Sequence, residues 1–180
     1  MAPFEKLREE EIAVGFRFTV ARAWYRAKDG TEFERHIVHH PGAVAVLPLH
    51  DDDTVTLVRQ FRAALDAHLL ELPAGLRDVA GEDDATTASR ELIEETGLAA
   101  GSIEHLATFH NSPGYCDETV AVFLATDLTP VPDARQGIEE EEMTVERLPL
   151  SEVLDQLSDG RITDAKTHVG IGALLRRRGG

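Results

Sequence analysis

The chain of 180 residues contains a single cysteine, Cys116, so it cannot form an intrachain disulfide. Its first residues hold no apolar run of the signal-peptide type, and no stretch approaches the roughly 20 apolar residues of a membrane-spanning helix. These absences favour a soluble protein in a reducing compartment, and we expect a cytoplasmic location.

Positive charge is also scarce, because 18 Lys and Arg residues face 33 Asp and Glu residues and give a formal net charge of −15. Nucleic-acid backbones and anionic membranes would repel such a chain, so neither is an expected partner. Small phosphorylated substrates remain compatible with this charge, since divalent cations bound by carboxylates reverse the local sign of a site.

Hydrophobic residues make up 42% of the chain, which is enough for one domain with a real core. Helices are predicted at 151–158 and 163–178, after most of the strands, which indicates an α/β (α+β) domain. The Asp29-Gly30 pair between the first two strands is a hairpin signal. We expect residues 1–41 to form an N-terminal β-hairpin arm and residues 42–180 to form the main domain. The predicted strands are 15–23, 31–38, 42–49, 54–61, 103–109, 119–126 and 143–148, and a further short run at 70–76 ends in a polar loop.

A further helix is predicted from Asp83 or Asp84 to Thr96. Either aspartate is a good N-cap, and Gly97 suits the position that follows the last helical turn. The apolar residues expected to face the core are Ala85, Ala88 and Leu92.

This helix carries Glu91, Glu94 and Glu95 at positions i, i+3 and i+4, which project to one face. Arg90 is adjacent, and Glu82 lies eight residues upstream, within its reach. One arginine cannot neutralise four carboxylates, whereas a hard cation such as Mg²⁺ takes oxygen ligands. A metal there would clamp the oxygens of a diphosphate and lower the pKa of a bound water. The alternative is a solvated acidic helix face with ordinary ion pairs.

The stretch from Arg90 to Leu98 resembles the Nudix box, whose core is Arg-Glu-apolar-x-Glu-Glu-x-Gly-apolar with a glutamate eight positions before the arginine, here Glu82. The resemblance implies a Nudix-type three-layer α/β/α sandwich with a mixed central sheet. One departure is visible: the family glycine falls at Leu76, while this chain has Gly75. The loop before Glu82 therefore holds one extra residue.

By this resemblance, Glu91, Glu94 and Glu95 are metal ligands for two or more Mg²⁺ or Mn²⁺ ions, with the backbone carbonyl of Ala74 as a further ligand. Glu94 is also expected among the catalytic residues. Glu82 and Arg90 would form a structural ion pair that orients the ligands.

Segments outside the box resemble the ADP-ribose pyrophosphatase branch of the family. The branch implies hydrolysis of ADP-ribose to AMP and ribose 5-phosphate by a homodimer that exchanges N-terminal strands. Arg59 and Arg62 would hold phosphates, and Glu71, Pro113 and Gly114 would also contact substrate. The segments are Val58–Arg62, Glu71–Gly75, Ser112–Gly114 and Gly160–Thr167.

A catalytic base is expected in the acidic loop before the strand at 143–148. Glu139 or Glu140 is favoured by spacing, with Glu141 next. Two other functions stay open: hydrolysis of another nucleoside diphosphate derivative, such as a nucleotide sugar, dinucleoside polyphosphate or oxidised nucleotide, and nucleotide sensing by a non-catalytic Nudix domain.

Overall fold

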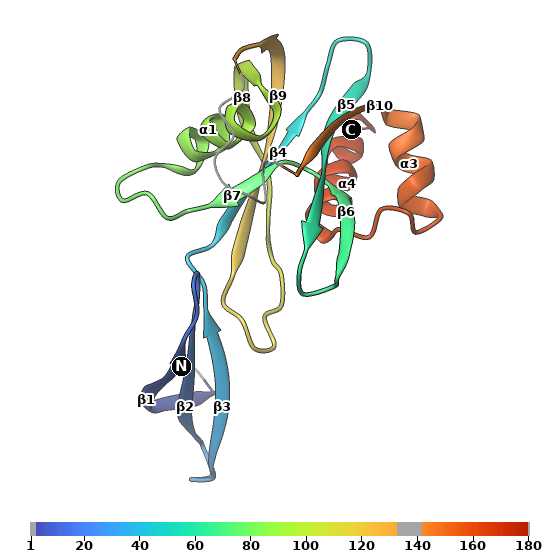
Figure 1. Ribbon diagram of the computed structural model, residues 1–180. Helices are drawn as coiled ribbons and strands as arrows, with labels where there is room; N and C mark the ends of the chain where they lie inside the picture. Colours follow the sequence, from blue (N-terminus) through green and yellow to red (C-terminus); the bar gives the residue numbers. More distant parts are fainter. Residues whose placement is uncertain (1–2, 133–141, 180) are drawn as a thin grey trace. The chain divides into compact units, whose positions relative to one another are not determined.

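The structure is a computed structural model that describes residues 3–132 and 142–179. It divides into two compact units (Figure 1). The first unit contains Met1–Gly42 and His110–Thr119, and the second contains Ala43–Phe109 and Val120–Gly180. No helix within the described ranges is long and apolar enough to cross a membrane.

The first unit contains an antiparallel sheet of three strands in the order β1 (Phe4–Val14), β2 (Thr19–Ala27) and β3 (Glu32–His39). Strands β2 and β3 form the predicted hairpin, and Gly30 in its turn has a φ of 87°. The strand predicted at 15–23 begins only at Thr19, because the N–H of Gly15 donates to the carbonyl of Phe18 at 2.8 Å in a tight turn.

The second unit has two sheets. One has the order β7 (Ala74–Leu76), β4 (Ala43–Pro48), β9 (Thr119–Pro130) and β8 (Leu98–His110). Strand β4 runs parallel to β9 and antiparallel to β7, which confirms the predicted mixed sheet. The other sheet has the order β10 (Thr144–Pro149), β5 (Thr54–Arg62) and β6 (Ala67–Glu71).

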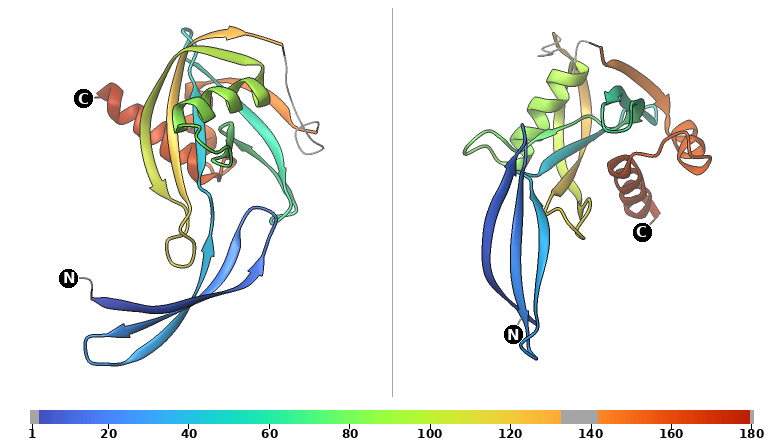
Figure 2. Two further views of the ribbon diagram at one scale, coloured as in Figure 1. Left: turned by 90° about the vertical axis from the view of Figure 1, so that its left-hand side faces the viewer. Right: turned by 60° about the horizontal axis from the view of Figure 1, so that its bottom comes forward.

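Three helices, α1 (Asp84–Thr96), α3 (Leu150–Ser158) and α4 (Ala165–Gly179), complete the second unit. Alternate residues of β4 point to opposite faces of its sheet. Val44 and Val46 pack with Ala88 and Leu92 of α1, whereas the alternate residues Ala45 and Leu47 belong to a larger core shared with β5, β6, α3 and α4. Figure 2 shows α1 on one side of the sheet and α4 on the other, so the predicted three-layer arrangement is confirmed.

Several element boundaries differ from the sequence-based prediction, among them β8 (Leu98–His110), which is longer at both ends than the predicted 103–109. The run at 70–76 forms parts of two strands, because Pro73 lies between β6 and β7 and has no N–H to donate. Helix α4 begins at Ala165, since the side chain of Asp164 accepts the N–H of Thr167 at 2.8 Å and acts as its cap. Helix α1 matches the prediction and is capped by Asp83.

His39 gives the first unit a pH-dependent contact. Its Nδ1 lies 2.6 Å from Asp117 and its Nε2 lies 3.1 Å from Glu9. The hydrogen bond to Asp117, with a smaller contribution from Glu9, raises the pKa of His39. The resulting stabilisation is complete below the ordinary histidine pKa of 6.5 and is lost as the pH rises through the raised folded value.

We therefore predict that His39→Asn lowers Tm by about 1–3 °C at pH 6, where wild-type His39 is charged. At pH 9 the same substitution should have a smaller effect, because the wild-type ring is then neutral. Thermal unfolding followed by circular dichroism at both pH values measures the difference. An equal loss of Tm at the two pH values would contradict the assignment.

Candidate active site

Helix α1 places the acidic residues of the site. Asp83 accepts the N–H of Thr86 at 2.8 Å, and Gly97 ends the helix with a φ of 65°. The helix buries one face against the sheet, and that face includes Glu91 and Glu95, which are 9% and 5% exposed. Two carboxylates are thus held in the interior by the same packing that buries Leu92.

Arg90 lies among the carboxylates. Its Nη1 donates to Glu91 at 2.7 Å and to Glu94 at 2.8 Å, and its Nη2 donates to Glu82 at 3.3 Å. Burial alone would lower the pKa of Arg90, but the ion pairs with Glu82, Glu91 and Glu94 outweigh it and raise the pKa. Glu82 also accepts a hydrogen bond from Thr87 at 2.9 Å. Arg90 therefore holds three carboxylates at fixed positions on one side of α1.

The backbone of β7 approaches α1 closely. The N–H of Ala74 donates to Oε2 of Glu95 at 2.9 Å. A Cβ atom built on Gly75 would lie 1.8 Å from Cδ of Glu91, so a side chain at this position would occupy the place of that carboxylate. The glycine at 75 rather than 76 thus has a packing role, and Gly81, with a φ of 84°, relaxes the longer loop that follows.

Glu95 has a strongly shifted acidity. Its pKa is raised to about 8, chiefly by burial and also by the neighbouring carboxylate of Glu91. The N–H of Ala74 and the charges of Lys166 and Arg62 act in the opposite direction. Lys166 and Arg62 are therefore electrostatic neighbours of the α1 carboxylates.

Arg62 and Glu71 form an ion pair in which the carboxylate is buried, while the Arg62 side chain is 39% exposed. Nε and Nη2 of Arg62 donate to the two oxygens of Glu71 at 2.8 and 2.6 Å. Lys166 also donates to Glu71, whose side chain is 1% exposed. Glu71, predicted to contact substrate, thus has both oxygens engaged by cationic side chains.

Arg59 lies on the same strand as Arg62, and its Nε donates to Glu146 of β10 at 2.6 Å. This ion pair involves the Nε atom of the Arg59 guanidinium. The outer edge, with Nη1 and Nη2, has the geometry to take a phosphate in a bidentate way.

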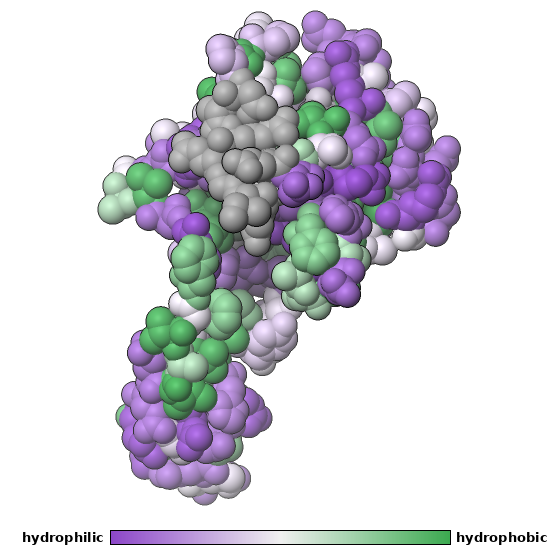
Figure 3. Space-filling model, in the orientation of Figure 1, coloured by the Kyte–Doolittle hydropathy of each residue, from purple (hydrophilic) through white to green (hydrophobic). Residues whose placement is uncertain are grey.

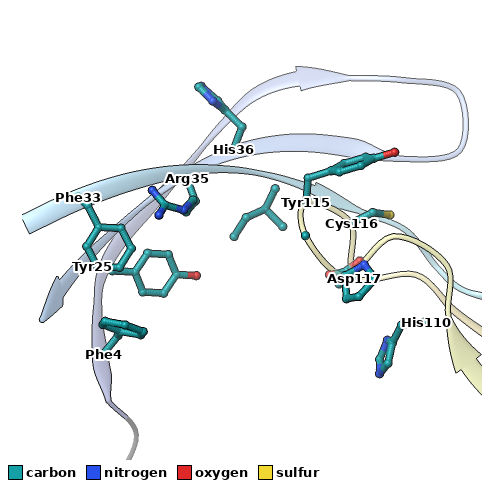
Figure 4. Close-up of a pocket in the computed structure, with 12 residues that line it drawn as sticks. Phe4, Tyr25, Phe33, Arg35, His36, His110, Tyr115, Cys116 and Asp117 are labelled. Atoms are coloured by element: carbon teal, nitrogen blue, oxygen red, sulfur yellow. The ribbon is translucent and has the colours of Figure 1, made fainter.

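The α1 carboxylates belong to the second unit, whereas Pro113 and Gly114 belong to the first. They line a cavity of about 490 Å³ whose other walls include Phe4, Tyr25 and Phe33 (Figure 4). The rings of Tyr25 and Phe33 stack with centroids 5.6 Å apart. Glu139, Glu140 and Glu141 lie outside the described residues.

The donor set on α1 has the chemistry that Mg²⁺ and Mn²⁺ prefer, since carboxylate and carbonyl oxygens are hard ligands. Within residues 3–132 and 142–179, no three His, Cys, Asp or Glu side chains are arranged as ligands of one ion. Glu91 and Glu94 instead point to Arg90. The site therefore fits a divalent cation in composition and position, and rotation of the glutamate side chains would be needed for their oxygens to converge.

The NUDIX domain family matches residues 39–168, and the chain belongs to this family, which confirms the resemblance seen in the sequence. Nudix hydrolases generally need a divalent metal ion. The chain is 37% identical over 168 residues to an ADP-ribose pyrophosphatase of Mycobacterium tuberculosis, covering 93% of this chain and 81% of that one. It is 40% identical over 143 residues to an ADP-ribose pyrophosphatase of Bacillus subtilis, covering 79% and 77%. A crystal structure of an ADP compounds hydrolase superposes with a TM-score of 0.84 at 25% identity, covering 98% of this chain and 94% of that one.

Several contacts around the site were not found by sequence reasoning. Lys166 and Thr167 lie in a motif noted only for its family resemblance, and Glu146 was not singled out. The one local signal was Asp164 three residues before Thr167, which is the spacing of an N-cap. Contacts between residues this far apart in the chain leave no mark in local sequence patterns.

Gly75 provides a direct test of the close approach between β7 and α1. We predict that Gly75→Ala lowers the free energy of unfolding by about 1–3 kcal/mol through overpacking. Displacement of the Glu91 carboxylate should also lower metal-dependent hydrolysis about 10–100-fold. Denaturant unfolding and steady-state kinetics measure the two effects.

Gly172→Ala in α4 is the matched control, because its new Cβ would meet Nη1 of Arg176 at an ordinary 3.5 Å. This variant should keep full activity and gain about 0.5–1 kcal/mol, as alanine is the better helix former. If Gly75→Ala behaved like Gly172→Ala, the contact with Glu91 would have no functional importance.

Proposed function

We propose that the chain hydrolyses the pyrophosphate bond of ADP-ribose and gives AMP and ribose 5-phosphate. The observation that carries the proposal is the buried carboxylate face of α1, packed against a backbone where only Gly75 leaves room for Glu91. The similarity to two ADP-ribose pyrophosphatases supports the choice of substrate.

Glu91, Glu94 and Glu95, with the backbone carbonyl of Ala74, would hold two or more Mg²⁺ or Mn²⁺ ions. Bound ions would neutralise charge on the diphosphate and supply a water of lowered pKa. Arg90 and Glu82 orient the carboxylates from the side, since Arg90 contacts both Glu82 and Glu94.

Arg59 and Arg62 would bind the phosphates of the substrate. Each is held by a carboxylate, Glu146 for Arg59 and Glu71 for Arg62, so each guanidinium has one fixed orientation. This makes Glu71 a residue that acts on substrate through Arg62. Preordering in this way reduces the entropy lost when substrate binds.

Glu139 or Glu140, with Glu141 next, is the proposed general base that assists the attack of water on phosphorus. Pro113 and Gly114 are proposed to contact the substrate. Replacement of Pro113 by alanine should affect turnover of ADP-ribose more than that of other diphosphates.

A panel of diphosphates tests the proposal. With Mg²⁺, we expect AMP release from ADP-ribose with a kcat/KM within the usual enzyme range of about 10⁴–10⁸ M⁻¹s⁻¹. Nucleotide sugars, dinucleoside polyphosphates and oxidised nucleotides should react more slowly, and EDTA should abolish turnover. Faster turnover of another diphosphate would overturn the substrate. Binding of ADP-ribose without AMP release would indicate a sensing domain.

Glu94→Gln tests the metal assignment within the same assay. Loss of a residue that hydrogen-bonds to a metal ligand lowers metal affinity or activity about 10–100-fold. Loss of a ligand itself should therefore lower kcat by at least about 100-fold. Glu104→Gln is the matched control, because this exposed carboxylate pairs only with Arg177 among the ion pairs of described residues. Glu104→Gln should leave kcat unchanged. Full activity of Glu94→Gln would contradict the assignment of Glu94 as a metal ligand.

We also propose a homodimer in which the N-terminal strands are exchanged. The first unit exposes large apolar side chains, including Phe16 at 90% and Val14 at 69%, and Figure 3 shows hydrophobic surface gathered on this unit. Contiguous exposed apolar surface of this kind is typical of protein interfaces.

Light scattering coupled to size exclusion should therefore give twice the chain mass of 19.7 kDa. Replacing Val14 and Phe16 together by serine should shift the protein towards monomer. Leu65→Ser, which changes a 61% exposed apolar side chain of the second unit, should leave the mass unchanged. A wild-type monomer at micromolar concentration would contradict the dimer.

A further inference from the structure

Helix α4 begins with a short polar segment that the proposed chemistry does not use, Asp164-Ala165-Lys166-Thr167. Asp164 caps the helix: its Oδ2 accepts the N–H of Thr167 at 2.8 Å and the hydroxyl of Thr167 at 2.6 Å. A cap needs only one such bond, so the second one fixes the rotamer of Thr167.

The hydroxyl of Thr167 also reaches a distant part of the chain. Its oxygen accepts the backbone N–H of Leu72 at 2.9 Å, across 95 positions of sequence, and Thr167 is fully buried. The hydroxyl therefore donates to Asp164 and accepts from Leu72. Removing it would leave a buried backbone N–H without its partner, which is costly.

Lys166 makes a second contact between the start of α4 and the backbone around Leu72, because it reaches the preceding residue, Glu71. Its ammonium donates to Glu71 and, at 2.9 Å, to Asp164, and all three side chains are largely buried. With Arg62, the cluster contains two cations and two carboxylates and is balanced in charge. Balanced pairing is what allows ionised groups to remain in an interior.

Helix α4 can make these contacts because Gly170 lets it approach. A Cβ atom on Gly170 would lie 2.8 Å from Cδ1 of Leu72, and Leu72 itself is fully buried. The backbone before β7 is thus held by packing as well as by hydrogen bonds.

The residues that follow Leu72 contact the carboxylate helix. The carbonyl of Pro73 accepts the N–H of Val46 at 2.9 Å, and the N–H of Ala74 donates to Glu95 at 2.9 Å. Gly75 then faces Glu91. This short backbone segment is therefore hydrogen-bonded to α4 through Leu72 and to α1 through Ala74.

We propose that Lys166 and Thr167 are positioning residues of the metal site, which fix the segment Leu72–Gly75 so that it holds Glu91, Glu95 and the carbonyl of Ala74 in place. The inference rests on the proposed function only in assuming that these groups bind a divalent cation. Neither residue needs to contact substrate or metal.

Thr167→Val is the central test, because it keeps the shape of the side chain and removes only the hydroxyl. The dissociation constant of Mn²⁺ measured without substrate should rise about tenfold, and kcat should fall about 10–100-fold with KM for ADP-ribose nearly unchanged. Thr167→Ser, which retains the hydroxyl, should restore both values. Lys166→Met should act in the same direction and leaves Glu71 paired with Arg62, so it tests the inference if Thr167→Val does not fold.

Thr56→Val is the matched control, since Thr56 is also buried and its hydroxyl lies 2.8 Å from the ring of His50. It should lower Tm without changing Mn²⁺ binding or kcat. If Thr167→Val and Lys166→Met bound Mn²⁺ as wild type does and changed only Tm, the inference would be overturned and the proposed function would stand. Failure of the wild type to bind Mn²⁺ would overturn both.

Discussion

The contact between helix α1 and the backbone of β7 places two carboxylates in the interior of the protein. Burying an ionised carboxylate costs several kcal/mol unless it is paired or hydrogen-bonded. Glu95 accepts a hydrogen bond from the N–H of Ala74, and Glu91 accepts one from the guanidinium of Arg90. The hydrogen bond from Ala74 requires the backbone of β7 to lie close to α1. At this distance only a glycine at position 75 leaves room for the carboxylate of Glu91.

Local signals predicted α1 and the fold class well, because helix caps and hydrophobic periodicity depend on residues a few positions apart. Asp83 and Gly97 lie at the ends of α1, and Ala88 and Leu92 are buried as predicted. Ala85 is exposed, contrary to expectation, since the first turn of α1 follows a loop that is itself exposed. Strand β1 was missed because six of its 11 residues are charged and no apolar alternation marks it.

The supporting contacts of the site could not be predicted, because they join residues that are distant in sequence. Thr167 meets Leu72 across 95 positions, and Arg59 meets Glu146 across 87. Sequence patterns indicated the side chains that are proposed to carry the chemistry, since the spacing of Glu91, Glu94 and Glu95 is a local property. They could not reveal what holds those side chains, which depends on how α4 and β10 pack on strands formed much earlier in the chain.

Two charge clusters of the second unit illustrate this division of roles. Around Glu71, two carboxylates meet two cations, and every side chain is engaged by an opposite charge. Around Arg90, three carboxylates meet one guanidinium, which leaves an excess of negative charge beside the buried Glu95. A balanced cluster has no excess of negative charge to attract a cation and is suited to fixing the backbone, whereas an excess of carboxylates favours the binding of a divalent cation. The difference in charge balance therefore separates the group that positions the site from the group that would bind metal, although both lie within the electrostatic reach of Glu95.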